Sequence, residues 1–235
     1  MINTNLLKQG IEDLGLVALN DQLNLMDKYA EALVEKNKVM NLTRITEPNK
    51  VLTDHFLDSL TTLLAYTPKN GDIFLDIGTG AGFPGVPLAI MNPNNKVVML
   101  DSTAKKINFV KETCKSLSVN NVTFLTGRGE VLAHNMEYRE KFDCVCARAV
   151  SDMKILSEIA LPYVKLGGVF IALKSINIKD EIQRAQNTIK NLGGVISEIK
   201  TVCVPISNTQ KYLIIIKKIS KTKKKYPRDY REIIK

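Results

Sequence analysis

Residues 73–88, IFLDIGTGAGFPGVPL, combine a short apolar run, an aspartate and four glycines within eight residues, after which an apolar pattern resumes. This order predicts a strand, a tight turn and the start of a helix. Glycines let a ligand approach the main chain, and the free N–H groups of a first helical turn favour an anionic group. The stretch therefore predicts a loop that binds a cofactor with an anionic end.

Strands and helices alternate on both sides of this loop, which favours a mainly parallel sheet covered on both faces by helices. The expected strands are residues 72–77, 96–101, 121–126, 142–147, 168–173, 195–204 and 211–219. The expected helices are residues 84–91, 103–117, 152–164 and 178–192. No helix separates the last two strands, so they should form an antiparallel pair at one edge.

The regions outside this alternating core differ from it in character. Residues 1–66 show apolar positions at helical spacing, which predicts an N-terminal helical extension packed on the core. Within it, Thr46 is expected to cap a helix that has Pro48 in its first turn. We therefore divide the chain into residues 1–66, a core of residues 67–219, and a tail of residues 220–235.

Composition excludes several classes of protein. The chain has 235 residues, of which 45% are hydrophobic and 24% are charged, as in an ordinary globular domain. Neither a signal peptide nor a long apolar span is present, which predicts a cytoplasmic protein without membrane contact. Four scattered cysteines and two histidines predict no metal site. Cys144 and Cys146 alternate within an expected strand and should be packed in the core.

Positive charge is concentrated at the end of the chain. Residues 217–235 carry nine basic and two acidic side chains, so that most of the net charge of +9 lies there. Such a segment can bind a polyanion, because each cation that neutralises a phosphate releases a counterion. The candidate RNA contacts are Lys223, Lys224, Lys225 and Arg228. A solvated, frayed tail is the alternative.

Polar groups follow the first four strands, where ligands bind in sheets of this kind. Asp101 ends the second strand about 20 residues beyond the glycines, the position that contacts ribose hydroxyls in nucleotide folds. Asp76 distinguishes two cofactors. A carboxylate there would repel the pyrophosphate of a dinucleotide, whereas S-adenosylmethionine presents an ammonium and a sulfonium that a carboxylate attracts. We therefore expect S-adenosylmethionine, held by Asp76, the loop glycines Gly78, Gly80 and Gly82, and Asp101.

An ordered set of motifs resembles the RsmG (GidB) family of bacterial methyltransferases. The set is NLT at 41–43, HxxDSL at 55–60, DxGTGxGxPG at 76–85, LDSxxKK at 100–106, GRGE at 127–130, RA at 148–149 and LK at 173–174. The resemblance implies a seven-stranded class I, Rossmann-like fold and transfer of methyl from S-adenosylmethionine to N7 of one guanine in 16S ribosomal RNA. It also implies cofactor contacts at Gly78, Phe83, Gly129, Glu130 and Arg148.

The chain departs from the family pattern at several positions. Glycine commonly follows the leucine and lysine where Ser175 stands here, the alanine usual before Glu130 is Gly129, and Arg-His before the last strand is Lys211-Tyr212. After residues 226–228, the sequence DYREIIK does not continue in the usual lysine, proline and glycine-rich manner. These departures bear on RNA contacts at Lys174 and in the tail rather than on the cofactor.

Chemistry at N7 sets modest demands on the protein. The atom already carries a lone pair, so no general base is needed, and positioning should dominate catalysis. We expect Arg148 to be the catalytic residue, orienting guanine O6 or holding a phosphate, with an ion pair as the structural alternative. Arg128 is a further candidate RNA contact, and His55 and Asp58 are candidates only for the lining of the site.

The expected partner is 16S rRNA or an assembly intermediate of the small ribosomal subunit, bound by a monomer. Two other functions remain possible from the residues alone. One is an NAD(P)-dependent oxidoreductase, because residues 80–85 match the dinucleotide glycine pattern. The other is a non-catalytic RNA-binding protein.

Overall fold

A single seven-stranded sheet organises the computed structural model, which describes residues 2–148, 151–175 and 178–234. Its strands are β1 (Ile73–Ile77), β2 (Lys96–Asp101), β3 (Val122–Thr126), β4 (Phe142–Arg148), β5 (Val164–Lys174), β6 (Gly194–Val204) and β7 (Thr209–Lys218). Ala149 of the RA motif and the last basic residue, Lys235, lie outside the described residues.

The strand order is β3-β2-β1-β4-β5-β7-β6. The first five strands pair in parallel, and β7 pairs antiparallel with both β5 and β6, which confirms the expected sheet and its edge pair. The order reverses between β1 and β4, and such a switch point opens a crevice outside the carboxyl ends of these two strands. The glycine loop follows β1 and Arg148 is the last residue of β4, so both lie at this point.

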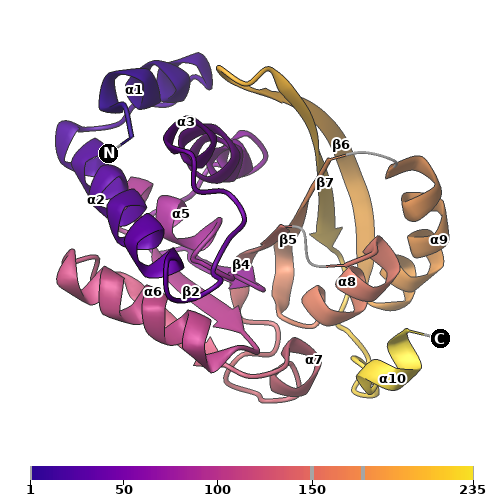
Figure 1. Ribbon diagram of the computed structural model, residues 1–235. Helices are drawn as coiled ribbons and strands as arrows, with labels where there is room; N and C mark the ends of the chain where they lie inside the picture. Colours follow the sequence, from indigo (N-terminus) through magenta and orange to yellow (C-terminus); the bar gives the residue numbers. More distant parts are fainter. Residues whose placement is uncertain (1, 149–150, 176–177, 235) are drawn as a thin grey trace.

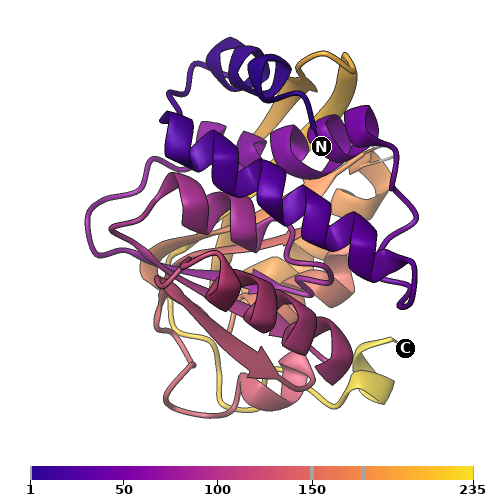
Figure 2. The same ribbon diagram turned by 60° about the vertical axis from the view of Figure 1, so that its left-hand side comes forward.

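Helices cover both faces of the sheet. They are α1 (Thr4–Asp13), α2 (Asn20–Asn37), α3 (Pro48–Lys50), η1 (Val51–Leu57), α4 (Asp58–Leu60), η2 (Thr61–Leu64), α5 (Gly85–Met91), α6 (Ala104–Ser116), α7 (Gly129–Leu132), α8 (Met153–Ala160), α9 (Ile178–Asn191) and α10 (Tyr230–Ile233). Figures 1 and 2 show α1, α2, α5 and α6 on one side of the sheet and α8 and α9 on the other. None of the helices within the described residues is both long and apolar enough to span a membrane.

Alternating strand residues supply two separate cores. Phe74, Cys144 and Cys146 point toward the N-terminal helices, whereas Leu75 and Val145 point toward α8 and α9. Successive side chains of a strand face opposite sides, so the next residue on the face of Cys146 is Arg148. Arg148 is thereby directed at the N-terminal helices. Cys144 and Cys146 are buried in the core, as expected.

Two local predictions were wrong. The helix cap is Glu47 rather than Thr46, since the Glu47 carboxylate accepts hydrogen bonds from the amides of Asn49 and Lys50. The fifth strand begins at Val164, four residues before the expected start, because α8 ends at Ala160. A Cβ at Gly168 would lie 2.8 Å from the Asp143 carbonyl oxygen, so glycine lets the two backbones approach there.

Candidate active site

The glycine loop after β1 is fixed to the end of β2. The amide of Gly78 donates to the Leu100 carbonyl (2.7 Å), and the amide of Gly80 donates to Asp101 Oδ2 (2.9 Å). The other oxygen of Asp101 accepts from the Thr103 amide (2.8 Å). These bonds hold the Asp101 carboxylate at the mouth of a hollow, where each oxygen keeps a further lone pair for a ligand.

This first hollow, of about 350 Å³, lies over the carboxyl ends of β1, β2 and β3. Its lining includes the predicted residues Gly78, Asp101, Arg128, Gly129 and Glu130. Gly80, Gly82 and Phe83 lie in the loop beside it, outside that lining. The structure thus brings the second-strand aspartate, the glycine loop and the segment after the third strand together, as the sequence predicted.

Asp76 lies beneath the loop and is fully buried. Its Oδ2 accepts from the Gly85 amide (2.8 Å), whereas Oδ1 and the Thr79 hydroxyl have no hydrogen-bond partner within the described ranges. Burial raises the pKa of Asp76 to about 6. Two neighbours reduce this rise in the pKa, the Thr79 hydroxyl and the charge of Arg148. The Thr79 hydroxyl is close to the carboxylate but does not meet the geometric criteria of a hydrogen bond. Two buried polar atoms under the loop therefore lack the donor and acceptor that a ligand could supply.

The far wall of the first hollow is formed by the segment after β3 and by the end of the chain. Arg128 Nε donates to Glu130 Oε1 (2.6 Å), and its guanidinium lies over the ring of Tyr230, 4.6 Å from the centroid. Tyr230, in α10, also lines this hollow. A Cβ at Gly129 would come within 2.7 Å of Ile159 Cγ2, so the glycine found here in place of the family's alanine fits the close packing against α8.

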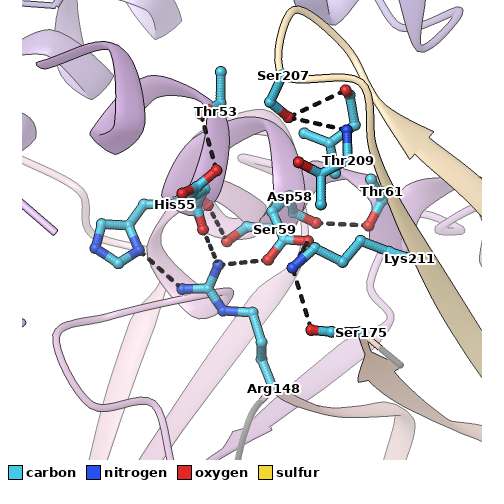
Figure 3. A network of polar contacts seen from close by, with 12 residues as sticks. Thr53, His55, Asp58, Ser59, Thr61, Arg148, Ser175, Ser207, Thr209 and Lys211 are labelled. Atoms are coloured by element: carbon cyan, nitrogen blue, oxygen red, sulfur yellow. Dashed lines mark hydrogen bonds and ion pairs between the residues drawn. The ribbon is translucent and has the colours of Figure 1, made fainter. Parts of the chain in front are cut away.

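A second hollow, of about 360 Å³, lies between the N-terminal helices and the ends of β4 and β5. It is lined by Ile45, Asp54, His55, Asp58, Arg148, Leu173, Lys174, Ser175 and Lys211. Figure 3 shows the polar side chains of this region converging from the N-terminal helices, β4 and the β6–β7 hairpin.

Arg148 organises the second hollow. Its Nη1 donates to the Asp54 carbonyl (2.6 Å) and to Asp58 Oδ2 (2.8 Å), and its Nη2 lies 3.2 Å from His55 Nδ1 (Figure 3). The π-helix η1 makes this possible, because the Asp58 amide bonds the carbonyls of Thr53 and His55 instead of Asp54. Arg148 therefore ties β4 to the N-terminal helices, and its ion-pair partner is Asp58 rather than Asp76.

His55 is held as a neutral imidazole. A guanidinium can only donate, so His55 Nδ1 accepts from Arg148, and Nε2–H donates to Thr43 Oγ1 (3.0 Å). Burial, and next the charge of Arg148, lower the pKa of His55 to about 3. The ring stacks on Phe83 with centroids 4.4 Å apart and an interplanar angle of 11°. His55 thus links the NLT motif, Arg148 and the glycine loop.

The neutral state of His55 predicts an acid-sensitive fold. Between pH 6.5 and about 3 the unfolded chain binds a proton at His55 that the folded chain does not, so the free energy of unfolding decreases as the pH falls. Relative to His55→Gln, the wild type should lose up to about 1.4 kcal/mol per pH unit in this window. Urea unfolding at pH 7, 6, 5 and 4 measures the difference, and parallel pH profiles would contradict the assignment.

Phe83 connects the glycine loop to two residues of the second hollow, His55 and Arg148. It is 4% exposed, with the edge of its ring against Phe56 and Tyr29, and the Arg148 guanidinium 5.5 Å from its centroid. Its side chain lines neither hollow, and a cofactor contact from Phe83 stays a prediction. Through Phe83 the glycine loop is in direct contact with Arg148.

Several residues expected to contact RNA already have partners within the protein. Lys174 Nζ donates to Glu181 Oε1 and to the Ser151 carbonyl (both 2.5 Å). Arg228 forms a two-bond ion pair with Glu158, which is 1% exposed. Lys223, Lys224 and Lys225 are exposed.

The described part of the tail is packed on the core. Arg139 donates from Nη1 and Nη2 to the carbonyls of Ala133, Thr222, Lys223 and Tyr226. Lys218 Nζ, itself buried, donates to the Leu161 carbonyl (2.6 Å). The segment then contacts α8 through Arg228 and Glu158 and ends in α10, whose Tyr230 lines the first hollow; Figure 1 shows α10 below α8 and α9. The basic composition of residues 217–235 gave no sign of this docking, although aromatic Tyr226 and Tyr230 among the lysines could have suggested it.

Comparisons with known proteins agree with this geometry. Residues 22–212 match the family described as GidB, rRNA small subunit methyltransferase G. A ribosomal RNA small subunit methyltransferase G of Lachnoclostridium phytofermentans is 44% identical over 220 residues, covering 94% of this chain and 91% of the relative.

Solved structures share the fold at low sequence identity. A SAM-dependent methyltransferase from Aquifex aeolicus has a TM-score of 0.55 at 18% identity, covering 78% of this chain and 97% of that one. The TYW2 protein of M. jannaschii, solved in complex with AdoMet, has a TM-score of 0.53 at 15% identity, covering 68% of this chain and 75% of that one.

Proposed function

The chain belongs to the family of rRNA small subunit methyltransferase G, and we propose that it transfers the methyl group of S-adenosylmethionine to N7 of guanine 527 in 16S ribosomal RNA. Family membership identifies an S-adenosylmethionine-dependent rRNA methyltransferase. The oxidoreductase and the non-catalytic RNA-binding protein are therefore not retained. Action in the cytoplasm as a monomer, on the small subunit or its assembly intermediate, is part of the proposal.

The residues of the first hollow fit the cofactor. S-adenosylmethionine supplies an electrophilic methyl group on a sulfonium, together with an ammonium, a carboxylate and ribose hydroxyls. Asp101, at the mouth of the hollow, can accept from the ribose hydroxyls. Asp76, buried beneath the loop with Oδ1 unpartnered, supplies the negative charge that attracts the ammonium and the sulfonium. Gly129 and Glu130 in the lining are the candidates for the remaining cofactor contacts.

The observation that carries the proposal is the second hollow, because two of its lining residues, His55 and Arg148, contact Phe83 of the glycine loop. A base that is flipped from its stack needs a pocket next to the reactive group of the cofactor. The second hollow lies beside the end of β4, where the sheet order reverses, and its lining combines apolar surface with charged side chains that can bind a base edge. The first hollow thus accommodates the donor and the second the acceptor.

Arg148 acts by position rather than by proton transfer. N7 of guanine is a neutral nucleophile with an available lone pair, so the reaction requires no group to remove a proton before attack. His55 Nδ1 is occupied by Arg148, which leaves no free imidazole nitrogen on that side for a base. Holding the reactants in line can supply about 7 to 11 kcal/mol of the rate enhancement. The chain therefore needs a rigid acceptor pocket, and Arg148 fastens its two walls.

Substitution of the acceptor atom tests the proposal. Small subunits reconstituted with rRNA that carries 7-deazaguanine at the target position keep the base shape and the Watson–Crick edge but lack N7. We expect methyl transfer to the guanine substrate and none to the 7-deazaguanine substrate. Equal transfer to both would show that another atom or nucleotide is the acceptor.

Tyr230 provides a test of the cofactor hollow. Its ring lines that hollow and supports Arg128, so Tyr230→Ala should weaken binding of S-adenosylhomocysteine by about tenfold. Tyr230→Phe retains the ring and should bind within about twofold of the wild type. Isothermal titration measures both variants, and wild-type affinity in Tyr230→Ala would remove the chain end from the cofactor site.

Exposed tail lysines provide a test of the RNA contact. Gln at Lys223, Lys224 and Lys225 should reduce the slope of log Kd against log salt for rRNA by about 2, since each released counterion contributes about 0.7 on a single strand. Binding of S-adenosylhomocysteine should not change. The matched control places Gln at three exposed lysines elsewhere, Lys96, Lys111 and Lys115. Equal slopes for the tail variant and the wild type would exclude these lysines as phosphate contacts.

A further inference from the structure

Asp58 carries an unsatisfied acceptor at the second hollow. The residue is 3% exposed, and its Oδ2 accepts from Arg148 Nη1. Its Oδ1 has no hydrogen-bond partner among residues 2–148, 151–175 and 178–234, although it forms an ion pair with the Lys211 ammonium at 3.8 Å, beyond hydrogen-bond distance. A buried carboxylate oxygen without a donor is costly, so it marks a place where a ligand supplies one.

The other charged groups of the hollow indicate the kind of ligand. Arg148 is bonded to Asp54, His55 and Asp58, and Lys174 is bonded to Glu181 and Ser151. These two cations are thus already paired within the protein, which disfavours a phosphate as the occupant. What is missing in the hollow is a donor, such as an N–H group, for the acceptor Asp58 Oδ1.

Lys211 places a hydrogen-bond donor beside the acceptor Asp58 Oδ1. Its ammonium is held only loosely, 3.4 Å from Ser175 Oγ and 3.8 Å from Asp58 Oδ1 (Figure 3). An acceptor and a donor therefore stand side by side on one wall. Guanine presents N1–H and O6 side by side on its Watson–Crick edge, with N7 on the other side of O6. Adenine in the same orientation presents an acceptor at N1 and a donor at N6, which would face the wrong partners.

We propose that Asp58 and Lys211 recognise the target guanine by its Watson–Crick edge. Asp58 Oδ1 accepts from N1–H, and the Lys211 ammonium donates to O6. Because N7 lies beyond O6, this orientation leaves it clear of the recognising wall and free to face the cofactor hollow. This inference rests on the proposed function, since it takes guanine as the acceptor. Asp58 and Lys211 are specificity residues that contact the substrate, and Arg148 positions Asp58.

A substrate analogue separates recognition from a structural role. 2-Aminopurine keeps N7 but has no O6 and no N1–H, so it lacks both groups that the wall recognises. Methyl transfer is measured in single turnover on small subunits reconstituted with guanine or 2-aminopurine at the target position. The comparison is the ratio of the two rates in wild type, Asp58→Asn and Lys211→Gln, because the ratio within each protein cancels its general defects.

We expect the wild type to prefer guanine by about 100-fold, and each variant to reduce this preference at least about tenfold. The control Asp152→Asn alters an aspartate that is also paired with an arginine, Arg184, and should keep the wild-type ratio. Binding of S-adenosylhomocysteine reports whether each variant is folded. Equal losses on both substrates in Asp58→Asn and Lys211→Gln would overturn the inference and leave the pair a support for Arg148.

The 7-deazaguanine substrate keeps this test distinct from that of the function. It retains N1–H and O6, so it should compete with the guanine substrate for binding to the wild type, and compete better than the 2-aminopurine substrate does. In Asp58→Asn this difference between 7-deazaguanine and 2-aminopurine should disappear. Transfer to 7-deazaguanine would refute N7 as the acceptor atom, and the preference for guanine over 2-aminopurine would still test recognition by Asp58. An unchanged preference in the variants would refute recognition by Asp58 while N7 remains the acceptor.

Discussion

Arg148→Lys should lower kcat/KM for methylation of small-subunit rRNA by at least about 100-fold, equivalent to about 2.7 kcal/mol. The guanidinium contacts Asp54, Asp58 and His55 from two nitrogens in one plane, and a lysine ammonium cannot reproduce this arrangement. The Asp58 carboxylate would lose the hydrogen bond from the guanidinium that offsets most of the cost of burying its charge, and His55 Nδ1 would lose its hydrogen-bond donor. The acceptor hollow would lose the connection between its two walls.

The effect should be confined to the acceptor side. Arg148 lines the second hollow and not the first, so in place of the cofactor contact that the family resemblance implies we expect binding of S-adenosylhomocysteine to change by less than about threefold. The matched control is Arg184→Lys, which alters an exposed arginine paired with Asp152 at 2.8 Å and should have little effect. Unchanged methylation in Arg148→Lys would remove Arg148 from the acceptor site.

Gly82→Ala should abolish detectable cofactor binding, with a loss of at least about 100-fold in affinity for S-adenosylhomocysteine. Gly82 has φ +92°, and an added Cβ would overlap the Tyr29 hydroxyl and lie 2.7 Å from Val86 Cγ2. That hydroxyl donates to the Ala81 carbonyl at 2.9 Å and fastens the glycine loop to α2. The loop must therefore shift, and such strain costs about 1 to 3 kcal/mol before any ligand contact is lost.

Gly71 offers a matched control for the backbone effect. It has φ +85°, and no atom lies within 4 Å of a Cβ placed there. Gly71→Ala should destabilise the protein by about 1 kcal/mol and leave cofactor affinity unchanged. Wild-type affinity in Gly82→Ala, or an equal loss in both variants, would contradict a specific role for the Gly82 conformation.

The sheet and the cofactor loop could be predicted from the sequence because their signals are local. Alternating apolar runs and intervening helical periodicity define β1 to β7, and the glycines with Asp101 mark the first hollow. The predicted position of Arg148 at the end of the fourth strand is also confirmed. Each of these features depends on residues that lie close together along the chain.

The acceptor hollow depends on contacts that the sequence does not display. His55 and Asp58 meet Arg148 across 93 and 90 positions of sequence, and a π-helix turns them toward it. Lys174 also lines the second hollow, but its ammonium is paired with Glu181 of α9. The end of the chain returns to the cofactor hollow because Arg139 and Glu158 bind its backbone and Arg228. Composition alone could not reveal these long-range partners.

Transfer of labelled methyl to purified small ribosomal subunits tests the central claim most directly. The protein is incubated with labelled S-adenosylmethionine and subunits that lack the modification, and the rRNA is digested to nucleosides. The account predicts that the label appears as 7-methylguanosine, at about one methyl group per subunit, and that Arg148→Lys and Gly82→Ala reduce it. Label in any other nucleoside, or no label in the RNA, would contradict the account.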